Sequence, residues 1–193
     1  MTAVYSNERN KRCLNLAVGN SYTACRCLVP IYNEVYAQTP YELEARNFEK
    51  YQSLMKGSSN IKDKLFICDT RNWRCPTDMT FDLILAGTNV WDRLGLFDAM
   101  YMLQTLAEGL TEKGWLVMAV TQCAYKSEQY TDKSKCRVIR PLEKYVKMLR
   151  CTGFTRATIV CSNLDAKLVY LMVNERHLLP RVGSTRPSQS YFG

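Results

Sequence analysis

Arg12-Cys-Leu-Asn-Leu-Ala-Val-Gly-Asn20 is the stretch of this sequence that decides its fold. The apolar residues Leu14, Leu16, Ala17 and Val18 make a run that is too short for a helix and too continuous for a strand with one side exposed to water. We therefore expect a central parallel strand that is covered on both faces. Gly19 follows this strand and leaves room for a ligand against the backbone. A turn of this kind, where a buried strand passes into a helix, is the usual ligand site of α/β domains.

The length and composition of the chain indicate one domain. With 193 residues and a hydrophobic share of 47%, the chain can bury a substantial core without disulfides or metals. We expect a single domain over residues 1–177 and a flexible tail over residues 178–193. No apolar run reaches the roughly 18 residues that cross a bilayer, and residues 1–12 lack an apolar secretory segment. The sequence therefore predicts a cytoplasmic protein with no membrane partner.

The nine cysteines and the one histidine do not have the spacing of a metal site. The cysteines include one C-x-C pair and no C-x-x-C pair, and His177 is the only histidine. Paired zinc ligands are therefore missing, and we expect no metal. An odd number of cysteines in a domain of this size also argues against a disulfide scaffold. We expect most of them to be reduced core residues, and His177 to lie on the surface.

Positive charge is concentrated in the second part of the chain. The formal net charge is +8. Residues 1–109 carry 12 Lys and Arg against 12 Asp and Glu, so of the totals of 26 and 18, residues 110–193 carry 14 against 6. A block this basic favours a polyanionic partner such as RNA, although a solvated basic face is the simpler alternative.

Apolar periodicity along the chain predicts strands that alternate with helices. The strands expected after the first one cover residues 34–37, 64–68, 81–87, 115–120, 157–161 and 167–173. The expected helices cover residues 21–32, 41–55, 96–113 and 142–149, the last one capped by Gly153. The connection between the last two strands is short, so these strands must be antiparallel. The pattern predicts an α/β fold with a doubly wound, mostly parallel seven-stranded sheet and a C-terminal antiparallel hairpin.

This order of elements resembles the class I, Rossmann-like S-adenosylmethionine-dependent methyltransferases over residues 12–175. In that family a Leu-Asp-Leu-Gly-x-Gly pattern after the first strand holds the methionine end of the cofactor. Here Asn15 and Ala17 stand where the acidic residue and the first glycine would be, and Gly19 matches the second glycine. The resemblance implies that S-adenosyl-L-methionine is the cofactor and that Ala17, Gly19 and Asn20 contact it.

The resemblance also implies cofactor contacts at the ends of the next strands. The family usually has a carboxylate after the second strand that binds both ribose hydroxyls, whereas this chain has Gln38 and Thr39. Asp69, followed by Thr70, stands after the third strand, where an aspartate commonly accepts the adenine amino group. An alternative interpretation of Asp69 is a turn or helix-cap aspartate. Ala86, next to the last residue of the expected fourth strand, is also expected to contact the cofactor.

Among methyltransferases, the sequence resembles most the enzymes that methylate guanine N7 of messenger-RNA caps. Residues 69–91 have their layout of an aspartate, a short loop and a Phe-Asp strand that ends in an aromatic turn. The resemblance implies that Trp91 stacks on guanine, that Asp92 orients the base and that Asp165 accepts a hydrogen bond from the guanine edge. Trp91 could equally be an ordinary aromatic residue at a helix start. Stand-alone domains of this kind occur in large RNA viruses of the nidovirus order.

The chemistry of N7 methylation fits a site without a general base. Guanine N7 has a free lone pair, so the enzyme mainly aligns nucleophile, methyl group and leaving sulfur. The fourth strand end lacks the Asp/Asn-Pro-Pro-Tyr motif of exocyclic-amine methyltransferases, and the fifth strand lacks the lysine used in ribose 2′-O methylation.

Residues 121–140 form a polar stretch that mixes aromatic side chains with cations. Such a mixture can stack bases and bind phosphates, although a solvated loop is the alternative. The residues that we expect to contact RNA are Tyr125, Lys126, Tyr130, Lys133, Lys135, Arg137 and Arg140.

Three functions remain open at this stage. The first is an active RNA methyltransferase, most simply one acting on the cap guanine N7 of a capped 5′ end. The second is a catalytically silent domain of the same fold that binds RNA or a protein. The third is a methyltransferase that acts on a ribose 2′-oxygen or on a small molecule. A nicotinamide-dependent oxidoreductase is disfavoured because Gly19 stands alone where G-x-G-x-x-G is needed.

Overall fold

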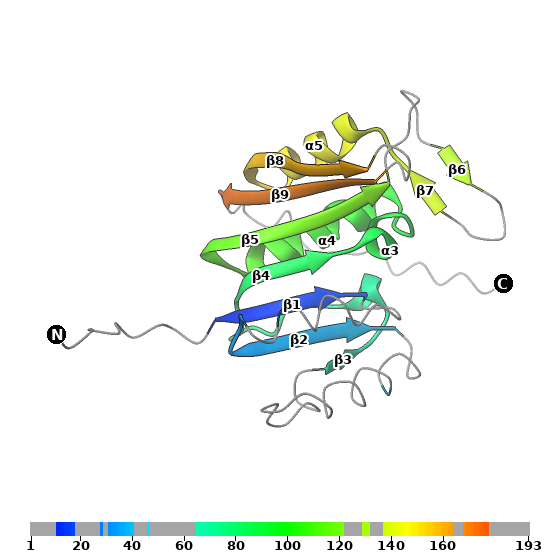
Figure 1. Ribbon diagram of the computed structural model, residues 1–193. Helices are drawn as coiled ribbons and strands as arrows, with labels where there is room; N and C mark the ends of the chain where they lie inside the picture. Colours follow the sequence, from blue (N-terminus) through cyan, green and yellow to red (C-terminus); the bar gives the residue numbers. More distant parts are fainter. Residues whose placement is uncertain are drawn as a thin grey trace.

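A twisted sheet forms the frame of the protein in the computed structural model (Figure 1). The structure describes residues 11–17, 28, 31–40, 46, 65–121, 129–131, 137–163 and 168–177. Within these residues the main sheet has seven strands in the order β3-β2-β1-β4-β5-β9-β8. Their bounds are β1 Arg12–Leu16, β2 Glu34–Thr39, β3 Leu65–Ile67, β4 Phe81–Ala86, β5 Leu110–Thr121, β8 Phe154–Asn163 and β9 Leu168–Arg176.

The strand directions confirm the predicted fold class. The pairs β1–β2, β1–β4, β2–β3 and β4–β5 are parallel, whereas β9 is antiparallel to both β5 and β8. β1 lies at the centre and is buried along Cys13 to Leu16, as its mainly apolar sequence predicts. Parallel pairing brings the carboxyl ends of β1 to β5 to one edge of the sheet, on the right of Figure 1.

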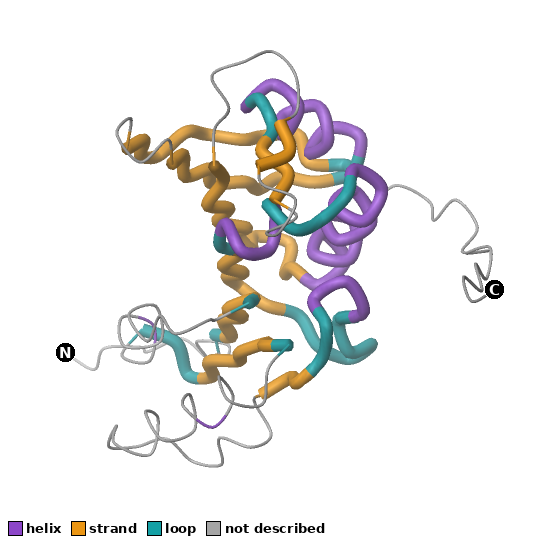
Figure 2. Tube along the Cα trace, turned by 90° about the vertical axis from the view of Figure 1, so that its right-hand side faces the viewer, coloured by secondary structure: helices purple, strands orange, loops and turns teal. Residues whose placement is uncertain are grey.

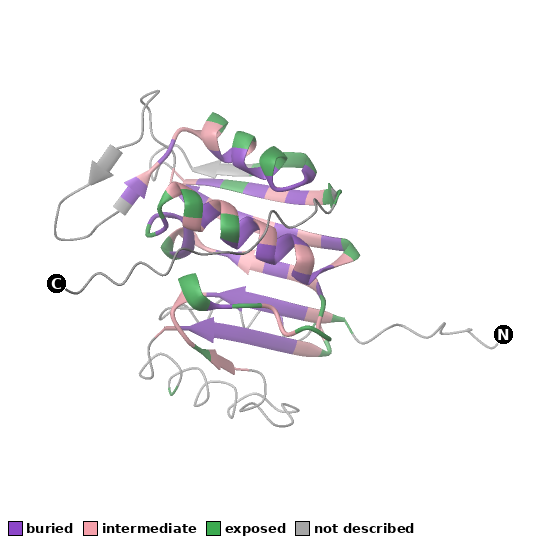
Figure 3. Ribbon diagram, turned by 180° about the vertical axis from the view of Figure 1, so that it is seen from behind, coloured by how far each residue is buried: buried purple, intermediate pink, exposed green. Residues whose placement is uncertain are grey.

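Two long helices cover one face of the sheet, as Figures 2 and 3 show. The helix α4, Leu96–Gly109, buries Ala99, Met102, Leu103 and Leu106, which recur at three-to-four spacing on its inner side. The helix α5, Leu142–Cys151, buries Tyr145, Met148 and Leu149. Most of these side chains join one hydrophobic cluster with the inner residues of the strands.

The end of α5 follows from the sequence. Gly153 has φ of 95°, in the left-handed region that a residue without Cβ adopts at little cost, and it stands directly after the helix cap Thr152. The prediction that Gly153 terminates this helix is confirmed.

Two predicted elements differ from the structure. The helix expected over residues 96–113 ends at Gly109, because β5 begins at Leu110 and pairs there with Phe81. The polar stretch expected as an unpaired loop contains a small antiparallel hairpin, β6 Gln129–Thr131 and β7 Arg137–Ile139. A short helix, α3 Thr88–Trp91, also follows β4; apolar periodicity does not predict so short a helix.

Several predictions fall partly or wholly outside the described residues. They are the helices expected over residues 21–32 and 41–55, and the tail over residues 178–193, so the proposed domain boundary stays a prediction. In the part of the chain that the structure describes, no helix is long and apolar enough to cross a membrane. His177 is exposed, as expected, and Cys13, Cys68, Cys75 and Cys151 are free thiols.

Candidate functional site

The candidate site lies where the parallel strands end. β1, β2, β3 and β4 are neighbours in the sheet, and their last residues are Leu16, Thr39, Ile67 and Ala86. In open α/β sheets, ligands bind outside the carboxyl ends of the strands where the chain order reverses. That reversal occurs here between β1 and β4, because β2 and β3 lie on one side of β1 and the later strands lie on the other.

Ala17, directly after β1, has a backbone conformation that normally favours glycine. Ala17 has φ of 51°, in the left-handed region that disfavours residues with a Cβ. This is the position where the methyltransferase pattern has its first glycine. Ala17 therefore has a backbone conformation that glycine adopts more easily. Gly19 and Asn20, the other residues expected to contact the cofactor here, lie outside the described residues.

Gln38 joins the ends of three strands. Its side chain is fully buried. The amide oxygen accepts hydrogen bonds from the backbone N–H of Ala17 (3.1 Å) and from the Thr70 hydroxyl (3.2 Å), and the amide nitrogen donates to the carbonyl of Cys68. A buried amide must find partners for both of its ends, and here they come from the turns after β1 and β3.

This bracing role differs from the ribose contact that we expected of Gln38. Thr39, the other residue expected there, is 1% exposed, and its carbonyl accepts the backbone N–H of Cys68 (3.1 Å). Neither side chain therefore lies open at the described end of β2. Burial also raises the pKa of the Cys68 thiol, so this cysteine is not an activated nucleophile.

Asp69 starts a turn of 3₁₀ helix, η2 Thr70–Asn72, after β3. Its carboxylate accepts the backbone N–H of Arg71 (2.8 Å) and forms a salt bridge with the Arg71 guanidinium (2.7 Å). These hydrogen bonds hold the pKa of Asp69 below its usual range. The turn interpretation of Asp69 is thus confirmed. Since 40% of its side chain is exposed, the adenine contact remains a prediction alongside it.

Trp91 does not have the position that guanine stacking requires. Its indole is fully buried in the main hydrophobic cluster, and its Nε1 donates to the carbonyl of Ala86 (3.1 Å). The predicted stacking on guanine is therefore wrong. Trp91 is a buried core aromatic at the end of α3, not at a helix start as the alternative had it. Ala86 is itself 1% exposed, so only its backbone is placed near a ligand at the end of β4.

Asp92 is also fully buried, and it holds the end of β5. One carboxylate oxygen accepts the hydroxyl hydrogen of Thr121 (2.9 Å), and the Asp92 carbonyl accepts the backbone N–H of Val138 (2.7 Å). The predicted direct contact with the base is not supported by this position. Asp92 instead connects α3 to the neighbouring strand β5 and to the hairpin strand β7.

Arg140 is buried, which overturns its predicted contact with RNA. Its guanidinium donates to the carbonyls of Trp91 (3.1 Å) and Leu94 (2.6 Å), at the end of α3 and just after it. A planar guanidinium with several donors suits this double contact. The β6–β7 hairpin, which projects beyond the carboxyl edge in Figure 1, is therefore anchored on α3.

Most of the other predicted substrate residues are not placed. Tyr130 and Arg137 lie on β6 and β7, but only their backbone is described. The remaining ones lie outside the described residues; they are Tyr125, Lys126, Lys133, Lys135 and Asp165. Their roles stay predictions.

Comparisons with known proteins agree with the fold. No protein-family model matches the sequence, and no curated protein matches it either. A S-adenosylmethionine-dependent methyltransferase from Clostridium acetobutylicum aligns with a TM-score of 0.67 and 14% identity, over 88% of this chain and 85% of that chain. One from Leishmania major aligns with a TM-score of 0.70 and 13% identity, over 86% and 64% of the two chains.

A third similar structure has a bound cofactor. The glycopeptide N-methyltransferase MtfA, in complex with S-adenosylmethionine, aligns with a TM-score of 0.61 and 14% identity, over 86% of this chain and 81% of that chain. The chain has the Rossmann-like methyltransferase fold. At this level of identity the likeness concerns the fold alone.

Sequence reasoning missed two arginines that shape this edge. Arg71 pairs with Asp69, and Arg74 stacks on Tyr101 with its guanidinium carbon 4.4 Å from the ring centroid. The pairing of Arg71 could have been suggested by its spacing of two residues from Asp69. The stacking of Arg74 on a residue of α4 depends on the fold, and no local pattern indicates it.

Proposed function

We propose that this protein is a methyltransferase that uses S-adenosylmethionine and acts on RNA, at guanine N7 of a 5′ cap. The observation that carries the proposal is the left-handed turn of Ala17 at the end of β1. In solved structures of this fold, MtfA binds S-adenosylmethionine, S-adenosylhomocysteine or sinefungin. Strained backbone of this kind occurs mainly at functional sites, so the conformation of Ala17 indicates that the turn has a function.

The described residues fit such a cofactor in part. Ala17 would shape the turn for the methionine end, and Asp69 and Thr70 would lie beside the adenine. The bound cofactor would supply an electrophilic methyl group on a sulfonium. No carboxylate stands at the described end of β2 for the ribose, since Gln38 and Thr39 are used within the fold. We therefore expect weaker cofactor binding than in enzymes that have this carboxylate.

The proposed acceptor requires little acid–base chemistry from the protein. Among the described residues at the carboxyl ends of β1 to β5 there is no lysine or histidine to serve as a general base. Guanine N7 needs none, because its lone pair is free and the main contribution of the enzyme is alignment. The excess of 14 basic over 6 acidic residues in residues 110–193 supports a polyanionic acceptor.

Methyl transfer to three RNAs tests the acceptor. The substrates are an RNA with a GpppA cap, the same RNA with an N7-methylated cap, and the uncapped RNA, each with radiolabelled S-adenosylmethionine. We expect label on the GpppA-capped RNA alone. Label on the N7-methylated cap alone would contradict N7 specificity and point to the ribose 2′-oxygen.

Calorimetry with S-adenosylmethionine tests the cofactor separately. The buried Gln38 and the missing ribose carboxylate favour a second candidate, a silent domain of this fold that binds RNA. Heat of binding with a saturable isotherm supports the enzyme. The absence of heat at millimolar cofactor, with and without capped RNA, would leave the silent domain.

A further inference from the structure

Two exposed aromatic side chains lie at the start of α4. Phe97 is 86% exposed and Tyr101 is 42% exposed, and among the described residues Phe97 is the most exposed large hydrophobic side chain. They are four residues apart on one helix, so they share a face. The Phe97 ring leaves most of its apolar surface in water, which favours a partner that covers it.

Two arginines next to these rings are held in place by the fold. The Arg74 guanidinium stacks over Tyr101, and its Nη1 donates to the carbonyls of Arg71 (3.1 Å) and Trp73 (2.6 Å). Trp73 is 2% exposed and fixes this segment in the core. The Arg71 guanidinium is fixed by Asp69 while 59% of its side chain stays exposed. Both cations are therefore ordered before any ligand arrives.

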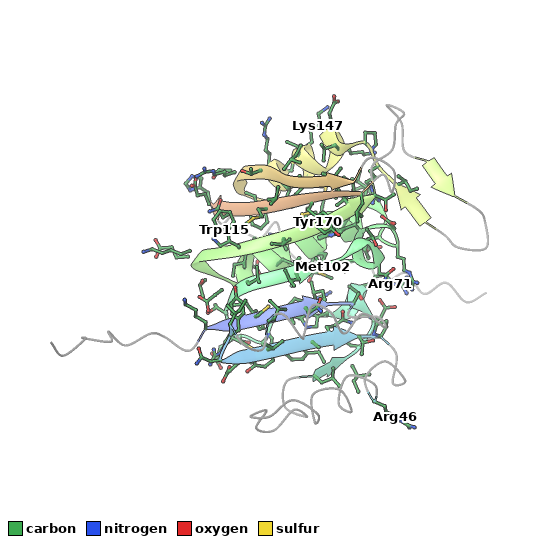
Figure 4. The ribbon with its side chains drawn as sticks, in the orientation of Figure 1. Arg46, Arg71, Met102, Trp115, Lys147 and Tyr170 are labelled. Carbon is green, nitrogen blue, oxygen red and sulfur yellow. The ribbon has the colours of Figure 1, made fainter. Side chains whose placement is uncertain are left out.

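This surface adjoins the candidate cofactor site. Arg71 belongs to η2, which follows the carboxyl end of β3, and Figure 4 places it at the carboxyl edge of the sheet. The helix α4 begins shortly after α3, which follows the end of β4. Phe97 lies in the first turn of α4. The aromatic and arginine residues thus extend the ligand edge toward the helix layer.

We propose that Arg71, Arg74, Phe97 and Tyr101 form a binding surface for the unpaired segment of RNA next to the methylated nucleotide. Bases would stack on Phe97 and on the Arg74–Tyr101 pair, and a phosphate would contact the Arg74 guanidinium, while Arg71, paired with Asp69, would border the surface. The proposal rests on the proposed function for its substrate class. It also supplies an exposed base platform, which the buried Trp91 does not.

The cation of this surface that favours a nucleic acid over an apolar protein segment is Arg74. Arg71 is balanced by Asp69, whose hydrogen bond and negative charge raise the pKa of Arg71, with a smaller contribution from Asp98. Arg74 donates to backbone carbonyls and stacks on Tyr101, and these contacts do not neutralise its charge. A cation lying flat on a ring suits a base edge and a phosphate together.

Fluorescence anisotropy with an unstructured, labelled RNA of about ten nucleotides tests the surface without cofactor. Because stacking on one aromatic ring is worth roughly 1–3 kcal/mol per base, we expect Phe97→Ala to raise the Kd about 5-fold or more and Phe97→Tyr to change it less than about 2-fold. Arg74→Gln should lower the slope of log Kd against log salt by about 0.7. Tyr170→Ala, on a strand face of the sheet (Figure 4), is the control and should leave the Kd unchanged.

The outcomes separate this surface from the proposed function. If wild-type protein binds RNA and Phe97→Ala and Arg74→Gln bind it equally well, the surface is refuted while RNA methylation stands. If the wild type does not bind RNA at low salt, both the surface and the RNA acceptor are refuted. Calorimetry would then still show whether the protein binds S-adenosylmethionine. If Phe97→Ala removes cofactor binding, the residue acts on the cofactor site, and the proposed RNA surface is again refuted.

Discussion

Ala17 carries a conformational cost that a single substitution can remove. A residue with a Cβ in the left-handed region destabilises the folded state by roughly 1–2 kcal/mol. Glycine removes this strain, but its greater freedom in the unfolded chain cancels part of the gain. We expect Ala17→Gly to raise the free energy of unfolding by about 1 kcal/mol. Urea denaturation measures the change. Ala37→Gly, in the buried interior of β2, is the matched control and should lower stability by roughly 0.5–1 kcal/mol.

Gln38 allows a prediction with a pH signature. In Gln38→Glu, a carboxylate oxygen replaces the amide nitrogen that donates to the Cys68 carbonyl. Two acceptor oxygens then face each other in a buried position. Burial raises the pKa of the new carboxyl above its unfolded value, so the folded state holds a proton that the unfolded state releases. Stability of this variant should therefore fall as pH rises above the ordinary glutamate pKa of about 4.3.

The comparison with Gln38→Met isolates the effect of charge. Methionine has nearly the same shape but leaves the Ala17 N–H and the Cys68 carbonyl without this partner, which costs about 1–3 kcal/mol per buried group. Urea denaturation between pH 4.5 and pH 8 should show a constant loss for Gln38→Met and a growing loss for Gln38→Glu. Parallel pH curves for the two variants would contradict the brace.

At the scale of elements, Arg140 fixes the β6–β7 hairpin on α3. Removing a buried guanidinium leaves the carbonyls of Trp91 and Leu94 without its donors, so Arg140→Met should lower the free energy of unfolding by about 2–4 kcal/mol. Hydrogen exchange at Val138, whose amide bonds to Asp92, should become faster. Arg156→Met, which removes an exposed ion pair with Glu175, is the control and should change stability by less than about 0.5 kcal/mol. Unchanged exchange at Val138 in Arg140→Met would show that the hairpin is held by other contacts.

The strands and the two long helices could be predicted because their signals are local. The mainly apolar segment from Cys13 to Ala17 and the three-to-four spacing in α4 are properties of single segments. The end of α4 at Gly109 could not be predicted, since the apolar period continues to Leu110 and only pairing with Phe81 assigns that residue to β5. The β6–β7 hairpin was missed because its strands are three residues long.

The functional residues were predicted less well, because their roles depend on contacts across the fold. The sequence predicted that the ends of β1, β2 and β3 meet, and hydrogen bonds of Gln38 to Ala17 and to Thr70, which follows Asp69, join these ends. It could not distinguish a side chain that faces a ligand from one that faces the core. Arg140 looked like one more cation in a basic stretch, yet it bonds to carbonyls 46 and 49 residues away in the chain.

At the scale of the whole molecule, the uneven charge predicts how salt affects catalysis. If residues 110–193, with 14 basic against 6 acidic residues, contribute to about three phosphate contacts, the slope of log affinity against log salt is about −2 for a single strand. Raising NaCl from 50 to 200 mM should then raise the KM for capped RNA roughly 20-fold. The KM for S-adenosylmethionine should change less than about 2-fold, since its binding releases few counterions. Steady-state methyl transfer at both salt concentrations measures the two constants, and an acceptor KM that does not respond to salt would contradict RNA and favour a small uncharged acceptor.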